Sequence, residues 1–240
     1  MAAFIWHKFV AVIYSLLLHG RPCCCSVMCG NAQLVHLPDF DHLFVNEHLL
    51  WNDQMESVAA CVSRCFLDTR CRSMQVDRNS SRCSGHATAF ASPSKIYPPA
   101  IVSQHSRLYL LPRAAHFIGS ACTSDGDCHV ATSVCNDGVC TCQIGLWFSP
   151  SQQACVTECS TLGSGLVRYP GYAIWGHDVS VHTSLGETSC PQLCRDTCQS
   201  IEFDGERNRC IINTVTYLRV NSTDQGQHPQ WAYYQRNCAA

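Results

Sequence analysis

The stretch Cys71-Arg-Ser-Met-Gln-Val-Asp77 decides the fold, because Cys198-Gln-Ser-Ile-Glu-Phe-Asp204 repeats its pattern, with three of seven positions identical. In both copies another cysteine follows 12 positions after the first, at Cys83 and Cys210. Upstream, the pair Cys61 and Cys65 has the same i, i+4 spacing as Cys190 and Cys194. Two copies at this distance indicate an internal duplication rather than a solenoid, which needs three or more short repeats.

The residues around the first cysteine pair predict a helix. Apolar and cysteine residues recur at intervals of three and four, which places one set on a single helix face: Val58, Cys61, Val62, Cys65 and Phe66. Ser57 stands where an N-cap is expected. By the duplication, we expect a second helix to carry Cys190 and Cys194.

After Cys71 the period changes to two, which predicts a strand. We expect Met74 and Val76 to be buried against the helix, and Ile201 and Phe203 to be buried in the second copy. Glu202 is expected on the opposite, exposed face. Turns at Asn79–Ser81 and Asp204–Glu206 and aromatic strands at Ser106–Leu111 and Gln230–Tyr234 complete the two units. The sequence thus predicts a disulfide-rich α+β fold.

The composition narrows the class of protein. Twenty of 240 residues are cysteine, near the level of disulfide scaffolds, and 46% are hydrophobic, which argues against disorder. Charged residues make up only 14%, and the net charge is -2. Nucleic-acid binders carry a strongly basic footprint, so we expect no nucleic-acid partner.

The N-terminus predicts secretion. Lys8 precedes an apolar run of ten residues, Phe9–Leu18, whereas a membrane-spanning helix needs about 20. We therefore expect a signal peptide at residues 1–30, with the secreted chain starting between residues 24 and 31; an uncleaved signal anchor is the alternative. Cleavage near Gly30 removes Cys23, Cys24, Cys25 and Cys29, leaves sixteen cysteines and changes the formal charge to -4. No later stretch is apolar for long enough to span a membrane.

The remaining cysteines fall into three even-numbered clusters of four, six and six, as self-contained disulfide modules require. We divide the chain into modules at residues 31–115, 120–156 and 157–240. The clusters are Cys61, Cys65, Cys71 and Cys83; Cys122, Cys128, Cys135, Cys140, Cys142 and Cys155; and Cys159, Cys190, Cys194, Cys198, Cys210 and Cys238.

The first and third modules resemble the PAN/Apple domain family. The resemblance rests on Cys-x3-Cys in a helix, a third Cys followed by Ser and alternating apolar residues, and a fourth Cys 12 positions on. It implies the bridges Cys61–Cys83, Cys65–Cys71, Cys190–Cys210, Cys194–Cys198 and Cys159–Cys238. Cys194 and Cys198 are only four apart, so their pairing requires the helix to end there.

The middle module looks like an EGF-like module. Cys140 and Cys142 form a Cys-x-Cys pair, followed by Gly145 and the aromatic residues Trp147 and Phe148. The resemblance implies the bridges Cys122–Cys135, Cys128–Cys140 and Cys142–Cys155. The stretch before the first cysteine has no carboxylate, so we expect no calcium, and Asp125 and Asp127 are interpreted as turn formers.

The sequence offers little for catalysis or cofactors. Cys-x2-Cys, which zinc sites favour, is absent from the mature chain, so we expect no metal and no other cofactor. His36, His42 and His48 recur every six residues and would share one face only if they lay in a single long strand, so we interpret the histidines as scattered surface and core imidazoles. Asp39 and Asp41 are interpreted as outward strand residues, and Gly163-Ser-Gly165 lacks the frame of a nucleophile elbow. We therefore expect that the protein is not an enzyme.

Two sequons and one arginine-rich segment are the candidate surface sites. Asn79 and Asn221 head Asn-x-Ser/Thr sequences in polar, turn-like stretches, where N-linked glycans fit. Five arginines lie within 19 residues: Arg64, Arg70, Arg72, Arg78 and Arg82.

These features favour a secreted, non-catalytic recognition or adhesion protein. The PAN/Apple resemblance implies binding of an extracellular protein or carbohydrate. The alternative is a glycosaminoglycan- or lectin-type binder that uses the five arginines to hold a polyanion.

Overall fold

The structure is a computed structural model that describes residues 33–239. The signal peptide, its cleavage point and Cys23, Cys24, Cys25 and Cys29 lie outside these residues. Leu34–Ala240 forms one compact unit. Within the described part of the chain, no helix has the length and apolar character needed to cross a membrane.

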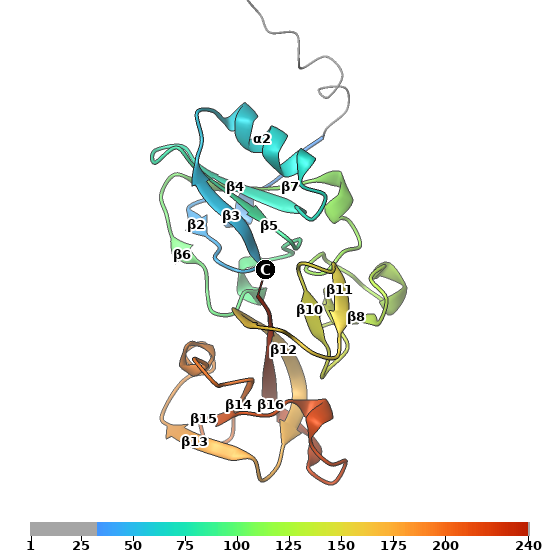
Figure 1. Ribbon diagram of the computed structural model, residues 1–240. Coiled ribbons are helices and arrows are strands. Elements are labelled where there is room, and N and C mark those ends of the chain that lie inside the picture. Colours follow the sequence, from blue (N-terminus) through green and yellow to red (C-terminus); the bar gives the residue numbers. More distant parts are fainter. Residues whose placement is uncertain (1–32, 240) are drawn as a thin grey trace, which may run out of the picture. The chain divides into compact units, whose positions relative to one another are not determined.

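Two five-stranded antiparallel sheets carry the fold (Figure 1). The first has the order β1-β7-β4-β5-β3. Its strands are β1 Val35–Leu37, β3 Leu49–Gln54, β4 Ser73–Asp77, β5 Arg82–His86 and β7 Ser106–Leu110. The second has the order β12-β16-β14-β15-β13. Its strands are β12 Leu162–Ile174, β13 Asp178–Thr183, β14 Ser200–Asp204, β15 Arg209–Asn213 and β16 Gln225–Cys238.

The two sheets have the same topology. In both, the first strand along the chain lies beside the fifth, followed by the third, fourth and second. The pairing register is also the same, because Val76 pairs with Cys83 and Phe203 with Cys210. The duplicated motif therefore occupies equivalent places, as the 12-position spacing requires.

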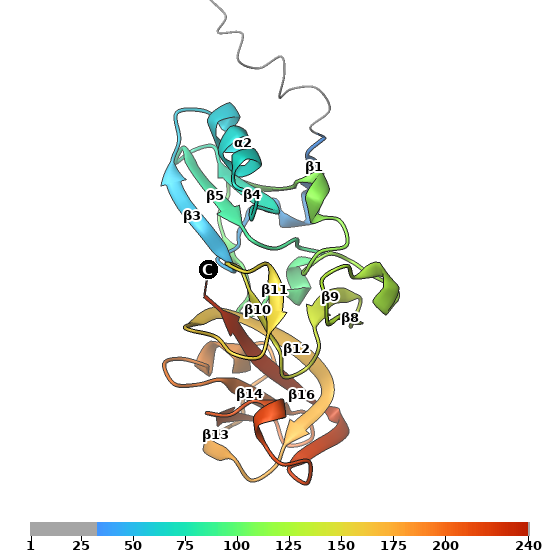
Figure 2. The same ribbon diagram turned by 45° about the vertical axis from the view of Figure 1, so that its right-hand side comes forward.

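The helix of the first copy is confirmed. Helix α2, Val58–Leu67, begins at Ser57, whose hydroxyl accepts a hydrogen bond from the Ala60 N–H. It lies along the first sheet (Figure 2) and buries Cys61 and Cys65 in a cluster with Met74 and Val76. The predicted inward face of this strand is thus correct.

The helix predicted for the second copy is wrong. Cys190–Leu193 forms only a short 3-10 helix, η5. Pro191 fits a first helical turn, but the Cys194–Cys198 bridge then turns the chain after four residues. Cys190 still packs in a cluster with Ile201 and Phe203, so the cover of this sheet is present without an α-helix.

The exposure predicted for Glu202 is also wrong. Its side chain does point away from Ile201 and Phe203, but it is fully buried. Gln75 is buried at the matching position of β4. Both faces of each central strand are covered, because chain segments from elsewhere in the sequence lie over the second face.

Shorter elements complete the structure. Two hairpins follow the first sheet: β8 Ser133–Asn136 with β9 Val139–Cys142, and β10 Trp147–Ser149 with β11 Ala154–Val156. A two-stranded ladder joins β2 Leu43–Phe44 to β6 Ile101–Val102. Single 3-10 turns occur at η1 Pro38–Phe40, η2 Pro93–Lys95, η3 Pro112–Ala114, η4 Asp125–Asp127 and η6 Tyr217–Arg219.

The expectation that Asp39 and Asp41 are outward strand residues is wrong. Pro38 starts the 3-10 turn η1, which ends β1 after three residues. Asp39 therefore lies in a turn, and Asp41 hydrogen-bonds His36 at 2.8 Å instead of lying on a strand. His42 and His48 adopt positive φ in the connections that follow, so the three histidines share no strand face.

Candidate binding site

The cysteines of residues 33–239 are joined in eight disulfides, in the same pairs that the family resemblances imply. They are Cys61–Cys83, Cys65–Cys71, Cys122–Cys135, Cys128–Cys140, Cys142–Cys155, Cys159–Cys238, Cys190–Cys210 and Cys194–Cys198. The sulfur atoms of Cys122, Cys128 and Cys140 lie within 4.8 Å of one another. All three are disulfide-bonded and so are not the thiolates that a zinc site needs.

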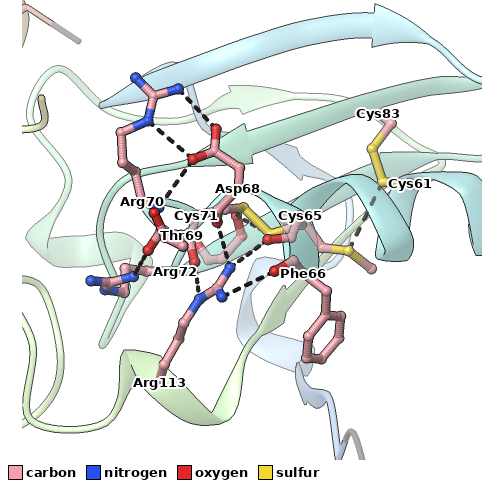
Figure 3. The surroundings of a disulfide bond; sticks show 12 residues. Cys61, Cys65, Phe66, Asp68, Thr69, Arg70, Cys71, Arg72, Cys83 and Arg113 are labelled. Carbon is pink, nitrogen blue, oxygen red and sulfur yellow. Dashed lines mark hydrogen bonds and ion pairs between the residues drawn. A yellow bond between two sulfur atoms is a disulfide. The ribbon is translucent and has the colours of Figure 1, made fainter. Parts of the chain in front are cut away.

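Arg113 anchors the end of α2 beside the Cys65–Cys71 bridge (Figure 3). Its Nε donates to the Cys71 carbonyl at 2.6 Å, and its Nη atoms donate to the carbonyls of Cys65, Phe66 and Asp68. The last carbonyls of a helix have no partner within the helix, and a cation there also opposes the negative end of the helix dipole. No sequence pattern predicts this role of Arg113.

Two of the five candidate arginines lie next to this anchor. Arg70 binds Asp68 through two parallel contacts of 3.0 and 2.9 Å, and this hydrogen-bonded guanidinium lowers the pKa of the Asp68 carboxyl (Figure 3). Arg72 donates to the Thr69 carbonyl at 2.6 Å and lies 4.3 Å from the centre of the Phe117 ring. Both guanidinium groups therefore already have partners within the chain.

The other three arginines lie elsewhere around the first sheet, Arg64 in α2 and the other two at the end of β4 and the start of β5. Arg64 forms an ion pair with Asp53 and stacks over Trp51 at 4.3 Å. Arg78 and Arg82 are exposed at the turn between β4 and β5. Because Arg72 precedes β4 and Arg78 follows it, the length of that strand, about 3.3 Å per residue, separates them. The structure does not gather the five arginines into one patch.

Both sequon asparagines are exposed. Asn79 lies in the turn between β4 and β5, and Asn221 lies in the turn between η6 and β16. The acids of the middle segment serve local structure. Asp127 accepts backbone bonds from Thr123 and Ser124, which lower its pKa to about 2, and Asp125 accepts the Cys135 N–H at 2.8 Å.

Two glutamates are buried: Glu202, which was expected to be exposed, and Glu47, which no sequence pattern singled out. Glu202 Oε1 accepts the Ile174 N–H, and its Oε2 has no hydrogen-bond partner among residues 33–239. Glu47 Oε1 accepts the Tyr97 N–H at 3.1 Å. Burial raises the pKa of each carboxyl to about 8. The alignment of Glu202 with Gln75 was the available signal, since two long polar side chains occupy the same strand position.

Comparison with known proteins identifies one part of the chain. The family model described as "PAN domain" matches residues 165–238. These residues resemble a PAN domain. They comprise most of the second sheet, including the repeat that begins at Cys198.

No match is found among curated proteins. Among solved structures, the chain is similar to the two N-terminal apple domains of Toxoplasma gondii microneme protein 4. The identity is 9% and the TM-score 0.27, over 86% of this chain and 94% of that one.

Proposed function

We propose that the protein is a secreted, non-catalytic recognition protein in which two PAN/Apple-like modules, residues 31–115 and 157–240, flank an EGF-like module at residues 120–156. PAN domains are often binding or adhesion modules, and the second sheet contains the PAN domain at residues 165–238. The ligand class is an extracellular protein or carbohydrate.

One observation carries the proposal: the first sheet repeats the strand order and register of the sheet that contains the PAN domain. Loss of an α-helix at η5 leaves this topology unchanged. The three bridges and two hairpins of the middle segment support an EGF-like module, because so short a segment needs cross-links more than a core.

The eight disulfides support secretion, since such bonds form and persist in oxidising compartments. In that compartment we expect N-linked glycans at Asn79 and Asn221, whose exposure leaves room for them. Enzymatic removal of the glycans, followed by peptide mass spectrometry, should convert both asparagines to aspartate. A glycan on Asn79 would cover the tip of the β4–β5 turn.

Polyanion binding by the arginines is the weaker alternative. The ion pairs of Arg64 and Arg70 neutralise two of the five charges, and Arg72 is engaged with Phe117. Of the five, Arg78 and Arg82 are both exposed at the β4–β5 turn. We expect elution from heparin at or below physiological salt, and retention well above it would favour this alternative.

A binding screen tests the proposed function. The secreted, disulfide-bonded protein is applied to an array of glycans and of purified extracellular-matrix proteins, and the same protein after reduction and alkylation is the matched control. Binding that depends on the intact disulfides supports the proposal. Equal signals from the two preparations, or measurable turnover of a bound substrate, would contradict it.

A further inference from the structure

Strand β13 forms an open edge of the second sheet. It stands at the end of the strand order, and its strand partner within residues 33–239 is β15 alone (Figure 1). Every residue of β13 is exposed except Ser180, which is half-buried. Alternate residues of such an edge direct their backbone N–H and C=O groups away from the sheet, where another strand can pair with them.

The composition of β13 leaves this edge largely unprotected. Natural edge strands are commonly protected by Lys, by Pro or by a β-bulge. β13 contains no Lys, Arg or Pro, and the exposed fractions of Val179 and Val181 are 61% and 44%. A bulge shifts the register between Asp178 and Ser180, but residues 180–183 beyond it pair regularly with β15. These four residues are therefore able to accept a further strand.

The equivalent edge strand of the first sheet, β3, is polar at the matching position. Val181 directly precedes the residue that pairs with Cys210, and Asn52 directly precedes the residue that pairs with Cys83. Val181 and Asn52 are therefore equivalent, and both are exposed. The outward face of the edge thus carries an amide in the first copy and an aliphatic side chain in the second.

The inward faces of the two edge strands differ as well. In the first copy, Arg64 of α2 pairs with Asp53 and stacks over Trp51, so the helix covers this face of β3. In the second copy the short η5 replaces the helix, and His182, which is equivalent to Asp53, is exposed. The loss of the helix therefore leaves β13 open on both faces as well as along its edge.

We propose that β13 pairs with β13 of a second copy of this chain, antiparallel about Val181, so that the two second sheets join into one continuous sheet. A two-fold axis at Val181 places this residue opposite its symmetry mate, and Ser180 opposite His182 of the second copy. The two valines then cover each other's exposed surface. The same residues serve both subunits, as a two-fold interface requires. This inference does not depend on the ligand class proposed above.

The charge of the strand favours the antiparallel arrangement. Asp178 is the only Asp or Glu in β13 and stands three positions from Val181. In the antiparallel pair the two Asp178 carboxylates lie six positions apart, which is about 20 Å at about 3.3 Å per residue. A parallel pair in register would bring them to about 5 Å, the distance between neighbouring strands. Because one pair of short strands buries less surface than a standard interface, we expect a dissociation constant in the micromolar range or weaker.

Sedimentation velocity of the full, disulfide-bonded secreted protein, from micromolar to near-millimolar concentration, tests the proposal. We expect a reversible equilibrium between monomer and dimer. Val181→Lys places two like charges opposite each other and should weaken dimerisation about tenfold or more. Asn52→Lys makes a matched change at the equivalent exposed position of β3 and should leave dimerisation unchanged.

Cysteine substitution tests the register of the pair. Residues directly opposite each other in antiparallel strands have Cα atoms about 4.5–5.5 Å apart, which is within the range of a disulfide. Val181→Cys should therefore give a covalent dimer on mild oxidation. Thr183→Cys should not, because its symmetry mate lies four positions away, or about 13 Å.

The wild-type concentration series decides the proposal even where a variant does not fold. A protein that stays monomeric over the whole range overturns it, and would leave the edge to a strand from another protein. A dimer that is unaffected by Val181→Lys, or one that is lost in Asn52→Lys instead, overturns it as well, because the contact would then lie elsewhere on the chain.

Discussion

Replacement of Glu202 by glutamine should stabilise the protein at neutral pH, although it changes a fully buried side chain. The carboxyl has a pKa near 8 in the folded protein, raised by burial from an ordinary value of 4.5. Its stabilising contribution is therefore fully present below pH 4.5 and is lost as the pH rises through 8. At pH 7 the carboxyl is ionised in the unfolded chain, because this pH lies about 2.5 units above its ordinary pKa. Folding must therefore protonate it, which costs about 3 kcal/mol of stability.

The first sheet shows how an uncharged side chain is accommodated at the position equivalent to Glu202. Gln75 occupies the equivalent position of β4, where its Oε1 accepts the Val45 N–H at 3.0 Å and its amide nitrogen donates to the Leu43 carbonyl at 2.5 Å. An uncharged amide therefore satisfies this kind of site without a proton. Gln75→Glu is the matched reverse substitution, and it should lower the free energy of unfolding at pH 7 by a similar amount.

Urea unfolding with the disulfides intact, followed by tryptophan fluorescence at pH 5, 6, 7 and 8, measures the effect. The difference between Glu202→Gln and wild type should grow by up to about 1.4 kcal/mol per pH unit. Glu47 titrates in the same direction in both proteins and cancels from the difference. A difference that stays constant from pH 5 to pH 8 would refute the reasoning, because it would mean that Glu202 is already ionised when folded.

Three further outcomes follow from the contacts. Arg113→Ala should lower the free energy of unfolding by about 3 kcal/mol, since four carbonyls lose a charged donor. In the same urea assay, Arg78→Ala, at an exposed position, should change it by less than about 0.5 kcal/mol, and equal effects would contradict the anchor role of Arg113. Phe203→Ala should cost about 3–5 kcal/mol, against less than about 0.5 kcal/mol for Glu206→Ala in the exposed turn, and a small loss at Phe203 would place it outside the core. Alkylation of the non-reduced, denatured secreted protein should add no mass, whereas labelled cysteines would indicate unpaired thiols.

The sequence was sufficient where a pattern is local. Helix α2, its cap at Ser57 and the inward strand face at Met74 and Val76 each follow from residues a few positions apart. The prediction that Glu202 is exposed was wrong because a period of two distinguishes the two faces of a strand without showing what covers each face. The Gln75 amide meets Leu43, 32 positions upstream, and that contact exists only once the sheet has formed.

The missing second helix shows which part of the duplicated unit is essential. Cys190 is fully buried against β14 and β15, as Cys61 is against β4 and β5, although only the latter belongs to an α-helix. The bridge to the fourth strand of each sheet, Cys61–Cys83 or Cys190–Cys210, fixes the covering segment in both copies. A cross-link that holds this segment on the sheet makes regular helix dispensable there.

The two arginines that bind the bridged loops, Arg113 and Arg236, could not be predicted from an alignment of the two copies. Arg113 donates to the carbonyls of Cys71 and Asp68 in the first copy, and Arg236 donates to those of Cys198 and Asp196 in the second. Cys71 and Cys198 are equivalent, but Arg113 follows its last strand while Arg236 lies within β16. Two arginines at unmatched positions thus bind the same bridged loop, because the carbonyls left by that loop require a donor whichever residue supplies it. An alignment of the two copies does not pair these arginines. They are found instead by asking, in each copy, which side chain donates to the carbonyls of the bridged loop.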